Sequence, residues 1–333
     1  MRRRDFISQT LAGSVLAPAA HAAGPQDDRT RREVDLTHRG QVEIERAASG
    51  KPHAGKVLAA IQPHADDIPL FAGGTVAKLI DEGYTGCLIR ITNDEKAGAG
   101  TTGEVILQNE RDNDAVAKAL GLEKVFNLEY RNHRLDSVSL QDIRARLIFL
   151  FRLLKVDTVV CYDPWSLYEE NPDHYVTAKM VEAACWMAET DKDYPEHLAA
   201  GLKPHGVTEK YYFARGPQLV TRVVDISATI DQKVEANLAN VTQGPAGVNG
   251  ARLRARLAAQ KRRLPVLGND DATANRQFIK EIVLDYDSEH LRGVPSDREL
   301  GHRYGLEWAE AFHFVGPIPS KLDEYVGQHA VSL

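Results

Sequence analysis

The sequence predicts an α/β protein with a Rossmann-like, mostly parallel sheet flanked by helices and followed by a helical or irregular C-terminal extension. From residue 51 onward, short apolar runs typical of buried strands alternate with longer segments of helical periodicity. Strands that alternate with helices indicate βαβ units, and such units build parallel sheets. A chain of 333 residues, 43% hydrophobic and 26% charged, is also large and apolar enough to bury a substantial core.

Each expected element has its own local signal. Apolar and β-rich runs predict strands at 57–61, 87–92, 125–128, 158–162, 210–214 and 220–226. Helical periodicity predicts helices at 70–82, 104–120, 141–154, 176–189 and 230–242. Pro69 suits the start of the first helix and Gly83 its end. The break at 244–247 ends the main domain, expected at 51–245, and leaves 246–333 as a capping extension.

The first residues predict an export signal instead of a part of the fold. A charged start precedes a short apolar stretch at 11–20 and the cleavage-like triplet Ala20-His21-Ala22. The run Arg3-Arg4-Asp5-Phe6-Ile7 resembles the twin-arginine export signal. We therefore expect a signal peptide at 1–23, an N-terminal arm at 24–50, the twin-arginine machinery as partner, and a periplasmic or secreted protein. The alternative is an uncleaved membrane anchor, for which the apolar stretch is short.

Composition and charge limit the remaining partners. A net charge of -6 gives no electrostatic reason to expect a nucleic acid. No later segment has the apolar length that a membrane span needs, so we expect no stable membrane insertion after the signal is removed. Cys87, Cys161 and Cys185 each lie in an apolar segment and lack metal-ligand spacing, which predicts buried free thiols. The basic run at 252–263 is most simply a solvated helix face.

Three chargeable side chains, His64, Asp66 and Asp67, follow the first expected strand and precede the first expected helix. In open α/β sheets, ligands bind at the carboxyl ends of strands. The two interpretations are a metal site and a helix cap, and we favour the metal site. A hydrolytic zinc site uses about three ligands of the His and Asp/Glu type and leaves one position for water. His64 and Asp67 supply two ligands, and Asp66 stays free to act as a base.

His174 is the candidate for the third ligand. It follows the strand at 158–162 and the long loop at 163–173, just before the next expected helix. Alone, a histidine at a helix start is more often a surface cap or a satisfied core residue. Two such segments, each in the connection between an expected strand and the next expected helix, favour the metal site.

These segments resemble the signatures of a known family. Pro63-His64-Ala65-Asp66-Asp67 is similar to the Pro-His-Pro-Asp-Asp-Glu motif of the PIG-L/LmbE-like zinc de-N-acetylases, and Asn171-Pro172-Asp173-His174 is similar to their His-Pro-Asp-His motif. Two further segments are similar to family sequences and support the resemblance. They are Val224-Asp225-Ile226-Ser227 with Lys233, Ala236 and Gln243, and the short segment 308–312. The resemblance covers residues 55–245, and the first two motifs are specific as a pair.

The resemblance implies an LmbE-like fold and a role for each matching residue. His64, Asp67 and His174 would bind Zn²⁺, which lowers the pKa of a water to about 7 and polarises an amide carbonyl. Asp66 would take the proton of that water and deliver it to the leaving amine. Tyr168 would reach the oxyanion, although its spacing to His174 is one residue longer than in the family. The expected substrate is a small-molecule or glycan amide, with N-acetyl as the first expectation.

The sequence also departs from the family pattern. Ala65 replaces a proline, Ile68 a glutamate, and Asn171 and Asn240 each a histidine. Asn171 can still donate a hydrogen bond but cannot carry a positive charge. Because the three ligands and the base are present, an active, exported zinc-dependent amidase is the favoured interpretation. The alternative is a catalytically silent carbohydrate-binding relative.

A second alternative is a Rossmann-type NAD(P) oxidoreductase. Residues 98–103 fit the pattern G-x-G-x-x-G and precede an expected helix. That fingerprint should follow a strand directly, whereas five residues, 93–97, intervene here. A polar substrate loop is the better interpretation. Arg111, just beyond it, is a candidate to bind a substrate hydroxyl or acid, and a solvated helix residue is an equal alternative.

Overall fold

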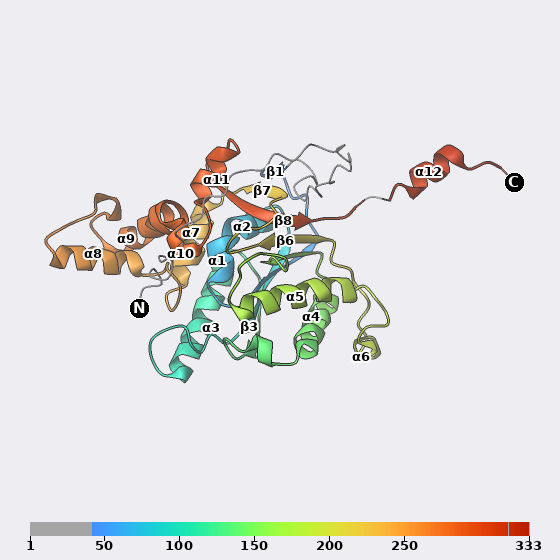
Figure 1. Ribbon diagram of the computed structural model, residues 1–333, viewed down its shortest axis with the longest axis horizontal. Helices are drawn as coiled ribbons and strands as arrows, with labels where there is room; N and C mark the ends of the chain where they lie inside the picture. The colour runs from blue at the N-terminus through green and yellow to red at the C-terminus, as the bar shows by residue number, and fades with distance from the viewer. Residues whose placement is uncertain (1–41, 319, 333) are drawn as a thin grey trace, which may run out of the picture. The chain divides into compact units, whose positions relative to one another are not determined.

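The computed structural model describes residues 42–318 and 320–332 (Figure 1). The expected signal peptide and most of the expected arm lie outside these residues. Within the described ranges, no helix has both the length and the apolar character needed to cross a membrane. Cys87, Cys161 and Cys185 are buried and free, which confirms the prediction for the thiols.

The predicted α/β fold is confirmed. Among the described residues, an eight-stranded sheet has the order β1-β7-β8-β6-β5-β2-β3-β4. Every pairing is parallel except those of β8, which runs antiparallel to both neighbours. The strands are β1 (Glu43–Glu45), β2 (Val57–Gln62), β3 (Thr85–Thr92), β4 (Lys124–Tyr130), β5 (Thr158–Tyr162), β6 (Glu209–Phe213), β7 (Arg222–Asp225) and β8 (Ala309–Val315).

The helices cover the sheet and continue beyond the last predicted helix. In Figure 1, α4 and α5 lie side by side, and α8 and α9 pack together next to α7. The α-helices are α1 (Asp67–Phe71), α2 (Gly73–Asp81), α3 (Thr102–Ala119), α4 (Leu140–Leu154), α5 (Pro172–Met187), α6 (Pro195–Ala199), α7 (Ile230–Ala239), α8 (Asn249–Ala259), α9 (Asp271–Phe278), α10 (Ser288–Arg292), α11 (Asp297–Arg303) and α12 (Leu322–His329). Short 3₁₀ turns span Leu135–Ser137 and Pro265–Leu267, and a π-helix spans Ile279–Tyr286.

The residues after 245 do more than cap the sheet. β8 lies between β6 and β7, so the sheet is continuous only because this late strand joins its two parts. The buried Glu310 of β8 also accepts hydrogen bonds from the backbone N–H groups of Gly74 and Thr75, at the start of α2. The description of 246–333 as a capping extension is therefore incomplete. The end of the expected arm also takes part, because β1 pairs with β7 at the sheet edge.

Two predicted helix boundaries were wrong in ways that affect the site. The helix expected at 70–82 is two helices, α1 and α2, interrupted at Ala72, whose φ is -139°. Helix α1 begins at Asp67 and not at Pro69, because Gln62 accepts a hydrogen bond from the Ile68 N–H and holds the first turn. Helix α5 begins at Pro172, before the expected 176, so His174 lies in its first turn.

The topology brings the two predicted segments together. β2 has β3 on one side and β5 on the other, and the chain continues outward from β2 in both directions. A crevice forms at the carboxyl ends of strands where the strand order reverses in this way. His64 follows β2 and His174 follows β5, so both lie at this crevice.

Candidate metal centre

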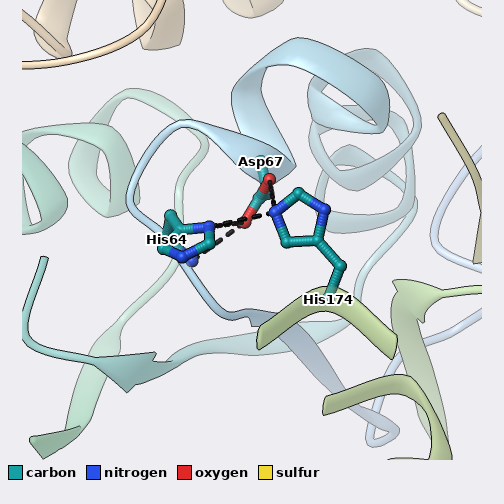
Figure 2. A group of neighbouring side chains, drawn as sticks. All are labelled: His64, Asp67 and His174. Atoms are coloured by element: carbon teal, nitrogen blue, oxygen red, sulfur yellow. Dashed lines mark hydrogen bonds and ion pairs between the residues drawn. The ribbon is translucent and has the colours of Figure 1, made fainter. Parts of the chain in front are cut away.

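His64, Asp67 and His174 form one buried cluster (Figure 2). His64 Nδ1 lies 3.0 Å from His174 Nε2 and 3.4 Å from Asp67 Oδ2. Asp67 Oδ1 lies 3.6 Å from His174 Nε2. Figure 2 shows the ring from α5 pointing across to the carboxylate and imidazole from the β2–α1 segment. The structure therefore brings together the three predicted ligands from two distant parts of the chain.

Each of the three side chains also contacts a further residue outside the cluster. His64 donates from Nε2 to Asp173 (3.1 Å), and the Tyr162 hydroxyl donates to Asp67 (2.7 Å). His174 Nδ1 makes a 3.1 Å ion-pair contact with Glu169. In metal sites, such outer partners fix the tautomer and direction of the ligands. The remaining nitrogens of the two imidazoles are thereby turned toward each other and toward Asp67.

The charges around the cluster favour a cation. Burial would raise the pKa of Asp67, but His174, His64 and Tyr162 lower it to about 2, so this carboxyl group is ionised. Burial would lower the pKa of His64, but Asp173 and Asp67 raise it well above its ordinary value. The carboxylates that favour a proton on His64 would equally favour a metal ion in its place.

The donor set fits zinc in type and spacing. Two imidazole nitrogens and one carboxylate oxygen are ligands of catalytic zinc sites. Zinc–ligand bonds of about 2.0–2.2 Å at tetrahedral angles place ligand atoms about 3.3–3.6 Å apart. The two imidazole nitrogens are 3.0 Å apart, and Asp67 lies 3.4 Å from His64 through Oδ2 and 3.6 Å from His174 through Oδ1, so the spacings are close to that range. These three side chains would hold a zinc ion, and catalytic zinc sites with three protein ligands leave a further position for water.

Asp66 lies beside the cluster without joining it. It is half-buried and lines the same cavity as the three candidate ligands. Burial and then the charge of Asp67 raise the pKa of Asp66 to about 7. A carboxyl group with this pKa can both accept and return a proton near neutral pH, as a general base and acid must.

The other predicted site residues have mixed outcomes. Asn171 lines the cavity, caps α5 by accepting the Asp173 N–H, and places its Nδ2 3.3 Å from His174 Nε2. Tyr168 is 85% exposed and is not part of the cavity wall, so the structure does not bring it to the site. Arg111 lines a separate hollow with Arg252 and is likewise absent from the cavity wall. A loop side chain can point either way, and sequence spacing alone does not fix its direction.

Sequence reasoning missed several residues that line the cavity. His133 and Asn132 follow β4, Lys96 follows β3, and Arg215 follows β6. Their common signal is the position just after a parallel strand, the same signal that identified His64. His133 has a left-handed backbone, with φ +58°, and its N–H donates to Asp173 (2.6 Å). The carboxylate that holds His64 therefore also fixes His133 at the cavity wall.

The structure disfavours the dinucleotide alternative. A pyrophosphate would bind at the exposed N-terminus of the helix that follows the glycine-rich loop. Here Thr101 and Glu104 form a capping box at the start of α3, and the Glu104 carboxylate accepts the Thr101 N–H at 2.8 Å. The protein's own carboxylate thus occupies the place that a phosphate would need.

Comparisons with known proteins agree with this arrangement. Residues 59–185 match the family model described as "PIG-L: GlcNAc-PI de-N-acetylase". A diacetylchitobiose deacetylase of Thermococcus kodakarensis is 28% identical over 200 residues, which is 58% of this chain and 72% of that protein. The fold resembles that of an N,N'-diacetylchitobiose deacetylase from Pyrococcus horikoshii, with a TM-score of 0.58 and 20% identity over 78% of this chain and 84% of that one. It also resembles a conserved protein of Thermus thermophilus, with a TM-score of 0.54 and 25% identity over 79% and 95% of the two chains.

Proposed function

We propose that this protein, whose residues 59–185 match the PIG-L family model, is a zinc-dependent hydrolase that removes an N-acyl group, with acetyl as the first expectation, from an amino sugar or related amide. The observation that carries the proposal is the convergence of His64, Asp67 and His174 at one point, with the free carboxyl group of Asp66 beside them. A purely structural cluster would not need a fourth ionisable group facing the same cavity.

In this proposal, His64, Asp67 and His174 hold zinc. When bound there, the ion supplies Lewis acidity, which lowers the pKa of water and polarises the amide carbonyl. Asp173, Tyr162 and Glu169 keep the ligands in their binding orientations.

Asp66 moves the proton in the proposed reaction. It accepts a proton from the attacking water and passes it to the amide nitrogen as the C–N bond breaks, so the products are a carboxylate and a free amine. Asn171 lines the cavity and offers an N–H donor to the oxygen on which negative charge develops. Tyr168 is exposed outside the wall of the cavity, so the oxyanion role implied for it is not part of this proposal.

The substrate class follows from the relatives and from the polar part of the cavity wall. The relative in T. kodakarensis is a diacetylchitobiose deacetylase, and we propose an N-acetylated amino sugar for this chain as well. Lys96, His133 and Gln243 line the same cavity as Asp66, and their hydrogen-bonding groups suit the hydroxyls of a sugar.

Metal analysis combined with a deacetylation assay tests this function. Purified protein prepared with zinc should contain about one equivalent of zinc and release acetate from diacetylchitobiose, and a chelator should abolish the release. Binding of the sugar that persists after chelation, with no acetate released at any stage, would instead identify a silent binding relative. A protein with no bound zinc after zinc supplementation would contradict the proposal.

We also propose export through the twin-arginine pathway, supported by the sequence Arg3-Arg4-Asp5-Phe6-Ile7. Cell fractionation should place the native protein outside the cytoplasm, and the double variant Arg3→Lys/Arg4→Lys should retain it inside. Equal export of both forms would contradict this route.

A further inference from the structure

A second hollow adjoins the metal centre. Its volume is 570 Å³, against 230 Å³ for the cavity at the metal centre, and both are lined by Phe71 and Arg292. Pockets that enclose small-molecule ligands span roughly 300–1,000 Å³, so the metal-centre cavity alone is small and the second hollow is of ligand size. A substrate that reaches the candidate ligands has room to extend only if it leaves the first cavity.

The wall of the second hollow is largely apolar. Phe213, Val220, Val294 and Leu300 contribute to it, together with Phe71. Its buried charges are already paired: Asp297 accepts from Arg292 at 2.8 Å and from Lys233 at 2.7 Å, and Lys233 also donates to Glu310 at 2.6 Å. Because these groups satisfy one another, the described residues of this wall offer a ligand no free buried charge, and the hollow favours an apolar one.

The wall of the metal-centre cavity combines polar and apolar side chains. Loops after β3, β4 and α7 supply Lys96, His133 and Gln243, whereas α1 and α10 supply Leu70, Phe71 and Leu291, with the paired Arg292 at the end of α10. The departing amine must lie near Asp66, since that group returns the proton. With the amine there, the acyl side of the amide can lie toward Phe71, which lines the second hollow as well.

We propose that the second hollow binds the aliphatic chain of an N-acyl substrate, so that the enzyme prefers acyl groups longer than acetyl. This inference rests on the proposed hydrolase function. The amino sugar lies on the polar side by Asp66, the scissile carbonyl lies at the metal centre, and the chain passes Phe71 into the hollow. Each methylene group buried there leaves water, and this gain increases the affinity for the substrate.

A chain-length series tests the proposal. Zinc-loaded protein is assayed with N-acetyl-, N-butanoyl-, N-hexanoyl- and N-octanoylglucosamine, and kcat/KM should rise about fourfold for each buried methylene group over the first steps. Asp66→Asn protein, in which turnover is blocked, gives a second readout: calorimetry should show tighter binding of the octanoyl than of the acetyl compound.

Variants locate the chain-binding site. Leu300→Trp and, independently, Val294→Trp fill the hollow, and each should lower the ratio of octanoyl to acetyl kcat/KM at least tenfold within the same preparation. Leu264→Trp is the matched control: Leu264 is 38% exposed and lines neither hollow, so the ratio should stay at its wild-type value. Thermal unfolding of each variant shows whether it is folded. Two filling positions are used so that the test can still be made if one of the two variants does not fold.

The outcomes separate this inference from the proposed function. A ratio that rises with chain length and falls in both filling variants supports the inference. Hydrolysis of the acetyl compound with no gain from longer chains overturns the inference and leaves the hydrolase function standing. A gain that both filling variants retain overturns the assignment to this hollow. Failure of the zinc-loaded protein on every amide of the series overturns the proposed function and this inference with it.

Discussion

Gly244 packs directly against Asp66. A Cβ at position 244 would lie 2.7 Å from Asp66 Oδ2, closer than real Cβ contacts, and the backbone of Gly244 has φ +76°. The glycine in the break after α7 is therefore what allows the chain to pass over the candidate base. The sequence indicated a break here, but not its contact with a residue 178 positions earlier.

We predict that Gly244→Ala lowers kcat about 10²-fold, because the new methyl group displaces the carboxyl group of Asp66 and a small misplacement of a catalytic group has effects of that size. Acetate release under saturating substrate measures it. Gly103→Ala is the control, since no atom lies within 4 Å of a Cβ there and its activity should be unchanged. Equal activity of both variants would remove Gly244 from this role.

The Asp66→Asn variant should retain zinc and lose about 10²–10⁴-fold in turnover, because the amide cannot accept the proton. Asp66 is not among the three clustered ligands, so the metal content should match that of the wild type. Metal analysis and kinetics on the same preparation test both parts. Loss of zinc together with activity would show that Asp66 is a ligand instead of a base.

The pKa of Asp66 should determine the pH at which kcat/KM falls on the acidic side. Only the ionised carboxylate accepts a proton, and its pKa is raised to about 7, so the rate should rise with pH up to that region and then level off. A bound cation would lower the pKa of Asp66, so the fall in kcat/KM would then occur at a lower pH. A rate that falls as the pH rises from 5 to 7 would contradict the assignment.

Asp173→Asn should weaken zinc binding about 10–100-fold, the usual effect of removing an outer partner of a histidine ligand. Asp173 accepts the His64 Nε2–H and fixes which nitrogen faces the metal. Competition with a chelator measures the affinity. Glu170→Gln is the control, because Glu170 is an exposed acid just before the same helix and is not one of the clustered residues. An equal effect of both changes would point to general charge and not to orientation.

All three cysteines should resist thiol reagents in the native protein. Burial raises the pKa of Cys87 and Cys185 to about 12 and that of Cys161 well above its ordinary value, so none forms a thiolate at neutral pH. A colorimetric thiol assay should detect no fast-reacting group before unfolding and three afterwards. A rapid native reaction would show that one of the buried segments opens.

The sequence was sufficient for the parts of the site that depend on local pattern. His64, Asp67 and His174 each stand at a crossing from strand to helix, and parallel-sheet topology makes such crossings converge. The failures depend on tertiary contacts. Ala72 interrupts a helix whose periodicity is continuous, and Tyr168 is exposed and does not line the cavity. His133 contributes to the cavity wall through a left-handed backbone that its own sequence does not signal.

Strand β8 has a consequence for how the protein is made. Phe312 pairs with Arg222, and Phe314 pairs with Tyr211, so two parts of the sheet stay apart until the nascent chain has been synthesised past residue 315. Such distant pairing slows folding. A shortened gene product that ends at the break after α7 would have two unpaired strand edges, and we expect it to aggregate instead of forming a smaller working enzyme.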